Sequence, residues 1–271
     1  MQERYPAVAG TFYENGMQAL KSHLDHMFSN LDVKGNCPIV ISPHAGYVYS
    51  GRTAAFAISS LKKASKFIIL GPNHTGLGQE FSLMSEGVWL TPMGGCRIDE
   101  EIAGKLESLD FVSNDIMAHD HEHSIEVQLP LLQHRFSDDF TFVPLCIMNT
   151  TYSDGFLKQC RELGRRIANI MRNDPDVAVI ASSDFSHYLP VKEADEKDGA
   201  ALKKIETLDV NGLFETLEKI DGSVCGFGPI AAVMEAAAQN KLKPRIIHKS
   251  SSGDASGNFR SVVAYYSIGF G

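Results

Sequence analysis

Short, continuous apolar runs alternate along the chain with longer amphipathic stretches. Such runs are typical of buried strands, and apolar residues at every third or fourth position are typical of helices. We expect strands over 38–42, 67–70, 140–148, 177–181, 244–248 and 260–270. We expect helices over 51–61, 99–106, 153–171, 191–207, 210–219 and 229–239. Because strands alternate with helices, the sequence predicts an α/β fold with a central, mostly parallel or mixed β-sheet and helices on both faces.

Three segments are less regular. The stretch 81–91 has the pattern of a β-hairpin, and 124–136 is helical in composition but contains Pro130, which predicts a helix in two pieces. The Ser- and Gly-rich run 250–257 is expected to form a mobile loop. No repeat is visible and no Pro/Gly/Ser-rich linker divides the chain, so residues 1–271 are predicted to form a single domain.

The composition narrows the class of protein. A formal net charge of −8 and the absence of any run of Lys and Arg argue against a nucleic-acid partner, which would need a basic face. No apolar stretch reaches the length of a membrane span, and the N-terminus lacks a secretory apolar core. The five cysteines are scattered and odd in number, which argues against a disulfide framework. We therefore expect a cytoplasmic protein without a membrane anchor.

Polar clusters follow several of the apolar, strand-like runs. They are Pro43-His44-Ala45-Gly46-Tyr47, Gly71-Pro72-Asn73-His74, Asp120-His121-Glu122-His123-Ser124 and Ser182-Ser183-Asp184-Phe185-Ser186-His187. In open α/β sheets, catalytic and binding groups gather beyond the carboxyl ends of the strands. Histidine is also the commonest metal ligand. Taken alone, each loop histidine could equally well cap backbone groups or bind a metal ion. Two such loops together favour metal ligation by His44 and His74.

A second group of histidines precedes the helical segment 124–136. His119 and His121 fit a metal-binding tract and a solvated, helix-capping loop equally well. His123 and Glu126 border the helix rather than the tip of the loop. These two residues are therefore the better candidates for a pocket.

Asp184 and His187 lie three residues apart at a strand end and are predicted to form an acid/base pair. A carboxylate near an imidazole stabilises its protonated form and fixes its tautomer. Ser186 lies between them, which raises a Ser-His-Asp hydrolase as an alternative. The close spacing and the absence of a G-x-S-x-G motif rank that alternative below metal chemistry.

Cys225 precedes the helix expected over 229–239. A helix N-terminus lowers the pKa of a thiol and favours the thiolate, which is either a metal ligand or a nucleophile. The other four cysteines lie in contexts typical of small buried hydrophobic residues.

Together these motifs resemble the Memo family, named for mediating cell motility in animals. The resemblance runs from Val8-Ala9-Gly10-Thr11-Phe12-Tyr13 to the last strand, and includes Tyr49-Ser50-Gly51, His121-Glu122-His123-Ser124-Ile125-Glu126 and Cys225-Gly226 besides the clusters at His44, His74 and Asp184. That family is similar in fold to the catalytic subunit of class III extradiol dioxygenases. The resemblance implies that His44, His74 and Cys225 hold a metal ion, with Asp184, His187 and His123 lining the same pocket as catalytic residues.

The resemblance departs from the extradiol enzymes at the third ligand, where a thiolate would replace a carboxylate. Thiolate ligands shift the preference of a site toward Cu(I), Zn or a differently tuned Fe. The leading hypothesis is a non-haem metalloprotein, with Fe or Cu favoured over Zn, that carries out redox or oxygen-dependent chemistry on a small molecule. The alternatives are a peptide- or ligand-binding module that uses the same pocket, and a metal-assisted or cysteine-based hydrolase. In prokaryotes the family is often associated with a radical-SAM protein, which implies a radical-SAM pathway partner.

Overall fold

Four parallel strands form the centre of the sheet in the computed structural model, which describes residues 2–137 and 139–271. Their order across the sheet is β8 (Thr141–Ile147), β3 (Lys66–Pro72), β9 (Val177–Ser182) and β2 (Ile39–Ser42). Every residue of β9 and β2 is buried. Continuous burial explains why these strands are apolar runs without alternation, as expected where helices cover both faces of a parallel sheet.

Antiparallel and short strands extend the sheet on both sides. β12 (Val262–Phe270) pairs antiparallel with β2, and also with β11 (Pro244–Ser251) and the short β10 (His187–Leu189). On the far side of β8 lie β6 (Gly94–Ile98), β5 (Val88–Thr91) and β1 (Glu3–Arg4), while β4 (Phe81–Leu83) pairs with β8 and with β7 (Ser113–Asn114). The sheet is therefore mixed, as predicted.

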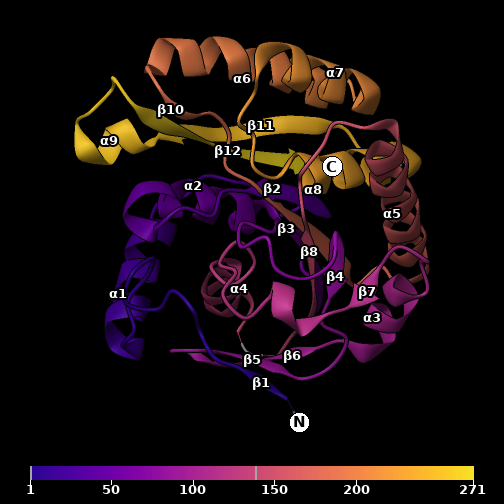
Figure 1. The fold of residues 1–271 in the computed structure, drawn as a ribbon. Coiled ribbons are helices and arrows are strands. Elements are labelled where there is room, and N and C mark those ends of the chain that lie inside the picture. The colour runs from indigo at the N-terminus through magenta and orange to yellow at the C-terminus, as the bar shows by residue number, and fades with distance from the viewer. Residues whose placement is uncertain (1, 138) are drawn as a thin grey trace.

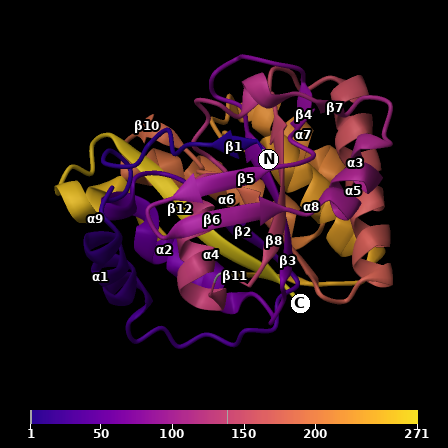
Figure 2. The same cartoon turned by 90° about the horizontal axis from the view of Figure 1, so that it is seen from below.

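Helices cover both faces of the sheet, which confirms the predicted fold class (Figure 1). One side carries α1 (Met17–Phe28), α2 (Tyr47–Ser60) and α4 (Gln128–Phe136), and the other carries α3 (Glu100–Glu107), α5 (Asp154–Asn173) and α8 (Phe227–Gln239). Figure 2 shows the same two groups from below. The helices α6 (Val191–Glu206) and α7 (Val210–Ile220) lie over β11 and β12 in Figure 1. None of the helices in the described ranges has an apolar stretch long enough to cross a membrane.

Two predicted elements are wrong. The hairpin predicted over 81–91 does not form, because β4 pairs with β7 and β8 and the hairpin is made by β5 and β6 instead. The helix predicted in two pieces over 124–136 is a single helix that begins at Gln128. Pro130 is the third residue of α4, and the N–H groups of a first helical turn have no intrahelical partner to lose.

A short helix occupies most of the run predicted to be a mobile loop. α9 (Ser252–Ser256) begins with a capping box, in which the Ser251 and Asp254 side chains bond each other's backbone N–H groups. These two polar residues satisfy N–H groups that a short helix leaves without partners. The helix places Ser252 and Ser256 beside the cleft described below.

The order of the central strands determines which loops meet. Because β3, β9 and β2 are adjacent and parallel, their carboxyl ends lie at one edge of the sheet. The segments that leave these ends contain His74, Asp184 and His44, respectively. The sequence correctly predicted that these motifs share one edge.

Candidate metal centre

His44 lies directly beyond β2 and is 2% exposed. Its Nδ1 atom is 2.9 Å from Ser182 Oγ, and its Nε2 atom is 3.2 Å from Cys225 Sγ. The backbone N–H of His44 donates to Asp184 Oδ1 at 2.9 Å, which joins the loop after β2 to the loop after β9. The ring is therefore held on both edges by side chains from neighbouring segments.

His74 and His123 share one carboxylate. Glu122 Oε1 lies 3.0 Å from Nδ1 of His74 and 3.3 Å from Nδ1 of His123. The two rings stack with centroids 4.7 Å apart and planes inclined by 23°. His44 approaches both rings edge-on, at 5.2 Å from His74 and 5.5 Å from His123.

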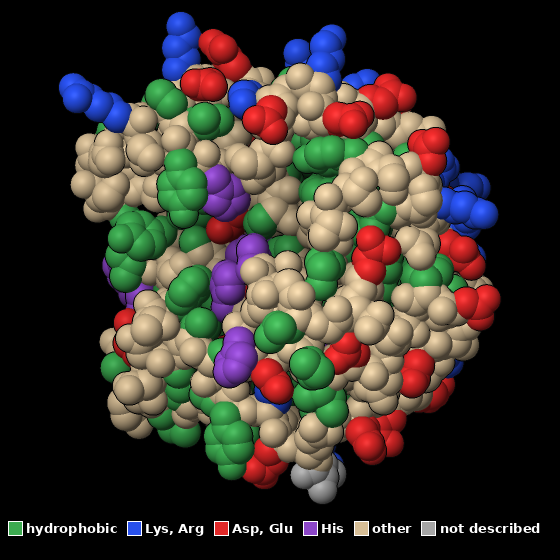
Figure 3. Space-filling view, in the orientation of Figure 1, with side chains coloured by type: hydrophobic (Ala, Val, Ile, Leu, Met, Phe, Trp, Pro, Cys, Tyr) green, Lys and Arg blue, Asp and Glu red, His purple; other side chains and the backbone are tan. Residues whose placement is uncertain are grey.

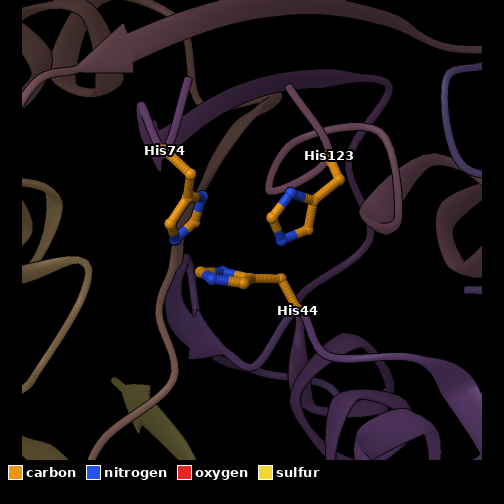
Figure 4. Close-up of side chains that lie close together, drawn as sticks. All are labelled: His44, His74 and His123. Carbon is orange, nitrogen blue, oxygen red and sulfur yellow. The ribbon is translucent and has the colours of Figure 1, made fainter. Parts of the chain in front are cut away.

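The three imidazoles converge (Figure 4). One ring nitrogen of each of His44, His74 and His123 lies within 4.8 Å of the others. Imidazole is a common ligand of Zn, Cu and Fe. The side chains are therefore arranged as a candidate site for a metal ion.

Burial favours the protonation states that a metal site requires. It holds the pKa of His44 well below its usual value, and the neighbouring His74 and His123 act in the same direction. Burial also lowers the pKa of His123. Burial of Glu122 opposes its ionisation, but the hydrogen bond to His74 and the nearby histidines hold its pKa at about 2. Neutral imidazoles and an ionised carboxylate are the forms that bind and orient a metal ion.

Cys225 lies near the start of α8 and is half-buried. Besides its contact with His44, Sγ accepts a hydrogen bond from the Asp184 N–H at 3.2 Å. Burial, together with the nearby Asp184, raises the pKa of this thiol well above its usual value. Burial therefore outweighs the lowering of this pKa that was expected from the helix N-terminus.

Asp184 and His187 both line the cleft, but the predicted pairing between them is replaced by other bonds. Nδ1 of His187 lies 2.8 Å from the carbonyl oxygen of Ser223, and its backbone N–H donates to Ser223 Oγ. Asp184 instead accepts from the His44 N–H, and burial raises its pKa to about 7. A backbone carbonyl therefore sets the orientation of the His187 ring.

Other residues considered in the sequence have different surroundings. His119 is buried with Nδ1 3.4 Å from Cys146 Sγ, whereas His121 is exposed. Ser186 Oγ donates to Asp198 Oδ1 at 2.7 Å, so its hydroxyl is not directed to His187 as a hydrolase triad requires. Glu126 bonds the N-terminal segment through both carboxylate oxygens. Sequence reasoning did not identify Glu122 as a partner of the histidines, although its position between His121 and His123 was visible.

The histidine cluster lies in a pocket of about 520 Å³. Aromatic side chains contribute to its wall, and these are Phe12, Tyr49, Tyr188 and Tyr265. Tyr188 is 78% exposed and adopts the left-handed backbone conformation, with φ at 59°, at an irregularity in the pairing of β10 with β12. Figure 3 shows histidine side chains in a hollow bordered by hydrophobic ones. The cleft is large enough for a small molecule.

Comparisons with known proteins agree with the resemblance seen in the sequence. Residues 4–269 match the family described as "Memo-like protein". A MEMO1 family protein of Sulfurisphaera tokodaii is 42% identical over 286 residues, covering 99% of each chain. A MEMO1 family protein of Methanosarcina barkeri is 40% identical over 268 residues, covering 98% of each chain. The crystal structure of an uncharacterized protein, JW3007, from Escherichia coli K12 is similar in fold, with a TM-score of 0.56, 15% identity and coverage of 87% of this chain and all of that one.

Proposed function

The chain belongs to the Memo family, and we propose that it is a non-haem metalloprotein that carries out redox or oxygen-dependent chemistry on a small molecule in the cleft. The convergence of three imidazoles, with one nitrogen of each within 4.8 Å of the others, is the observation that carries this proposal. The Nδ1 atoms of these rings contact Ser182 or Glu122. Such outer contacts are typical of metal-binding histidines.

The donor set fits a metal ion that accepts nitrogen and sulfur. Metal–sulfur bonds of about 2.3 Å and metal–nitrogen bonds of about 2.05 Å place tetrahedral donors about 3.6 Å apart. Cys225 Sγ is 3.2 Å from His44 Nε2, which is close to that separation. We propose His44, His74 and Cys225 as ligands. The ring nitrogens of His44 and His74 converge with that of His123, and Cys225 is included because its Sγ contacts His44 Nε2. Imidazole and thiolate together suit Fe, Cu and Zn.

A bound Fe or Cu ion supplies the capacity to bind and activate oxygen, and a bound Zn ion acts as a Lewis acid. The chain's own residues supply proton transfer. In the neutral His187 ring, a proton on Nδ1 donates to the Ser223 carbonyl and leaves the lone pair on Nε2. Burial lowers the pKa of His187, which favours this neutral form. The ring is therefore suited to act as a general base toward a molecule in the cleft.

The second candidate is a module that binds a small molecule or a peptide without turning it over. The exposed aromatic side chains of Tyr49 and Tyr188 at the cleft favour it, because rigid aromatic residues supply much of the contact area at binding sites. Both candidates use the same cleft. They differ in whether the metal ion takes part in a reaction.

The test is to supply metal-free protein separately with Fe(II), Cu(I) and Zn(II), and to measure affinity and oxygen consumption. We expect His44→Ala to abolish specific binding, and His121→Ala, at an exposed histidine nearby, to leave it unchanged. Cys225→Ser should weaken Cu(I) binding far more than Fe(II) binding, because a thiolate is the softer ligand. His187→Ala should retain the metal and lose oxygen consumption.

Each hypothesis predicts a different result. Failure of the wild-type protein to bind any of the three ions would overturn the metal site. Equal losses of Cu(I) and Fe(II) affinity in Cys225→Ser would remove Cys225 from the ligand set. Metal binding without oxygen consumption, combined with ligand binding that survives metal removal, would favour the binding module.

A further inference from the structure

The Glu122 carboxylate lies against His74 and His123, and we propose that it is a positioning residue that fixes the tautomer of the His74 ring. In this arrangement Nδ1 of His74 carries the proton, and Nε2 of that ring is left free for a ligand. The inference deepens the proposed metal-binding function and rests on it for its biological purpose. The tautomers themselves can be observed without any metal.

The carboxylate joins two loops that are distant in sequence. Oε2 accepts from the backbone N–H of His74 at 2.5 Å, in the loop after β3. Oε1 accepts from the backbone N–H groups of His123 and Ser124, both at 2.8 Å, in the loop before α4. The same Oε1 atom is hydrogen-bonded to Nδ1 of His74 at 3.0 Å, whereas its 3.3 Å approach to Nδ1 of His123 is an electrostatic contact. The side chain of Glu122 is 1% exposed, so these contacts are made away from bulk water.

The chemistry of the carboxylate determines the tautomer. A neutral imidazole has one N–H group and one unprotonated nitrogen, and an ionised carboxylate only accepts hydrogen bonds. Contact between Nδ1 and Oε1 therefore stabilises the tautomer in which Nδ1 carries the proton. Its Nε2 then presents a lone pair, which is the form of histidine that binds a metal ion.

The loop amides make the carboxylate difficult to replace. Both oxygens accept from backbone N–H groups, whereas a glutamine would offer one oxygen and one NH₂ group. With its oxygen directed toward His123 and Ser124, a glutamine would place NH₂ against the N–H of His74. Two donors would then face each other at the His74 backbone N–H, while Oε1 would still accept from the His123 and Ser124 N–H groups and from Nδ1 of His74.

The experiment measures nitrogen chemical shifts of the histidine rings by NMR in metal-free protein, together with affinity for Zn(II) and Fe(II). In the wild-type protein we expect His74 to be protonated on Nδ1 alone. In Glu122→Ala the His74 ring should exchange between tautomers, and metal affinity should fall by about 10- to 100-fold. Added acetate should partly restore both readouts, because it supplies the missing carboxylate.

Two further variants separate positioning from folding. Glu122→Gln keeps Oε1 as an acceptor for Nδ1 of His74 and should disturb that ring less than Glu122→Ala does. Asp120→Asn removes the same charge from an exposed position two residues away and should change neither ring. A His74 tautomer and a metal affinity unchanged in Glu122→Ala would overturn the proposal, and so would a His74 ring disturbed as much in Glu122→Gln as in Glu122→Ala. Fixed tautomers in a wild-type protein that binds no metal would support the positioning role and refute the metal-binding function.

Discussion

Asp198 is a buried carboxylate whose environment opposes its charge. It lies on α6 and is 1% exposed. Oδ1 accepts from the N–H and the hydroxyl of Ser186, whereas Oδ2 is buried and has no hydrogen-bond partner among the described residues. Burial raises the pKa of Asp198 to about 6, although the two hydrogen bonds from Ser186 oppose this rise. Asp195 on the same helix adds to it, and Lys249 on β11 reduces it. The ionised form is therefore less stable in the folded protein than in the unfolded chain.

This raised pKa predicts a pH-dependent change in stability. The pKa of Asp198 is higher in the folded protein than in the unfolded chain. Below the unfolded pKa the group is protonated in both states and does not affect stability. As pH rises from there to about 6, the unfolded chain ionises first and the free energy of unfolding falls. Asp198→Asn keeps an acceptor for Ser186. The difference in free energy of unfolding between this variant and wild type should rise by about 1–2 kcal/mol from pH 5 to pH 8, in favour of the variant. Urea unfolding of both proteins at these two pH values measures the difference.

The comparison between the two proteins cancels the titration of other groups, including Asp184 and the buried histidines. Glu196→Gln provides the control, because it removes a charge from an exposed position on the same helix. That control should show the pH dependence of the wild-type protein. An Asp198→Asn variant with unchanged pH dependence would contradict the prediction.

For single residues, the sequence predicted where a side chain lies in the fold better than which groups it contacts. His44, His74 and Asp184 are identifiable because each follows a strand-like run, and parallel strands bring such residues together. The partner of His187 was not predictable, because Ser223 lies 36 positions away and contacts the ring through a backbone carbonyl. The role of Glu122 likewise depends on how two loops meet.

The contact between α5 and α8 is the clearest case in which a helix pair depends on a small residue. Gly164 lies inside α5, and an added Cβ atom there would clash with the carbonyl oxygen of Ala232 and lie 2.7 Å from Cβ of Glu235. Both neighbours belong to α8. Since backbone atoms and a Cβ cannot move aside as a side-chain end does, the helices would have to separate.

We therefore expect Gly164→Ala to destabilise the protein by about 1–3 kcal/mol through overpacking. Gly199→Ala is the matched control, because Gly199 lies inside α6 and an added Cβ atom there meets nothing within 4 Å. The control should be stabilised by about 0.4–1 kcal/mol, since alanine restricts the unfolded chain more than glycine does. Chemical denaturation measures both effects, and stabilisation by both substitutions would show that the helices accommodate the methyl group.

The elements that the sequence predicted are those whose pattern is local. The buried strands β2, β3 and β9 are continuous apolar runs, and α5 is strongly amphipathic with Ser153 as its N-cap. The pairing of β4 was missed because it depends on β8, which lies far along the chain. The effect of Pro130 was overestimated because it depends on where α4 begins. Neither non-local pairing nor a helix start is specified by apolar periodicity alone.

For the whole molecule, the candidate metal centre depends on contacts between distant parts of the chain. Segments after β2, β3 and β9, the loop before α4 and the start of α8 all contribute side chains. The N-terminal segment is joined to the same assembly. Arg4 on β1 donates to the carbonyl oxygens of His119 and Glu122, and its guanidinium pairs with Glu126 at 2.5 Å. The loop that carries Glu122 and His123 is therefore held from behind by the first strand.

Glu126 is the centre of this N-terminal connection. Its side chain is fully buried, and besides Arg4 it accepts from the N–H groups of Ala7 and Val8 and from the Tyr13 hydroxyl. Glu126→Gln would leave the guanidinium buried without a counter-charge and would turn an NH₂ group toward one set of donors. We expect a loss of about 3–5 kcal/mol in the free energy of unfolding, as for other buried pairs that lose one partner.

The loss should extend from stability to the metal centre. We expect faster hydrogen exchange in residues 119–126 of Glu126→Gln and weaker metal binding, because the loop that orients His123 loses its support. Glu101→Gln is the control, since Glu101 pairs with Lys105 on the surface and its side chain is 74% exposed. Surface pairs of this kind contribute at most about 1 kcal/mol. A Glu126→Gln variant no less stable than this control, with unchanged exchange in 119–126, would mean that the N-terminal segment only covers the loop and does not hold it in place.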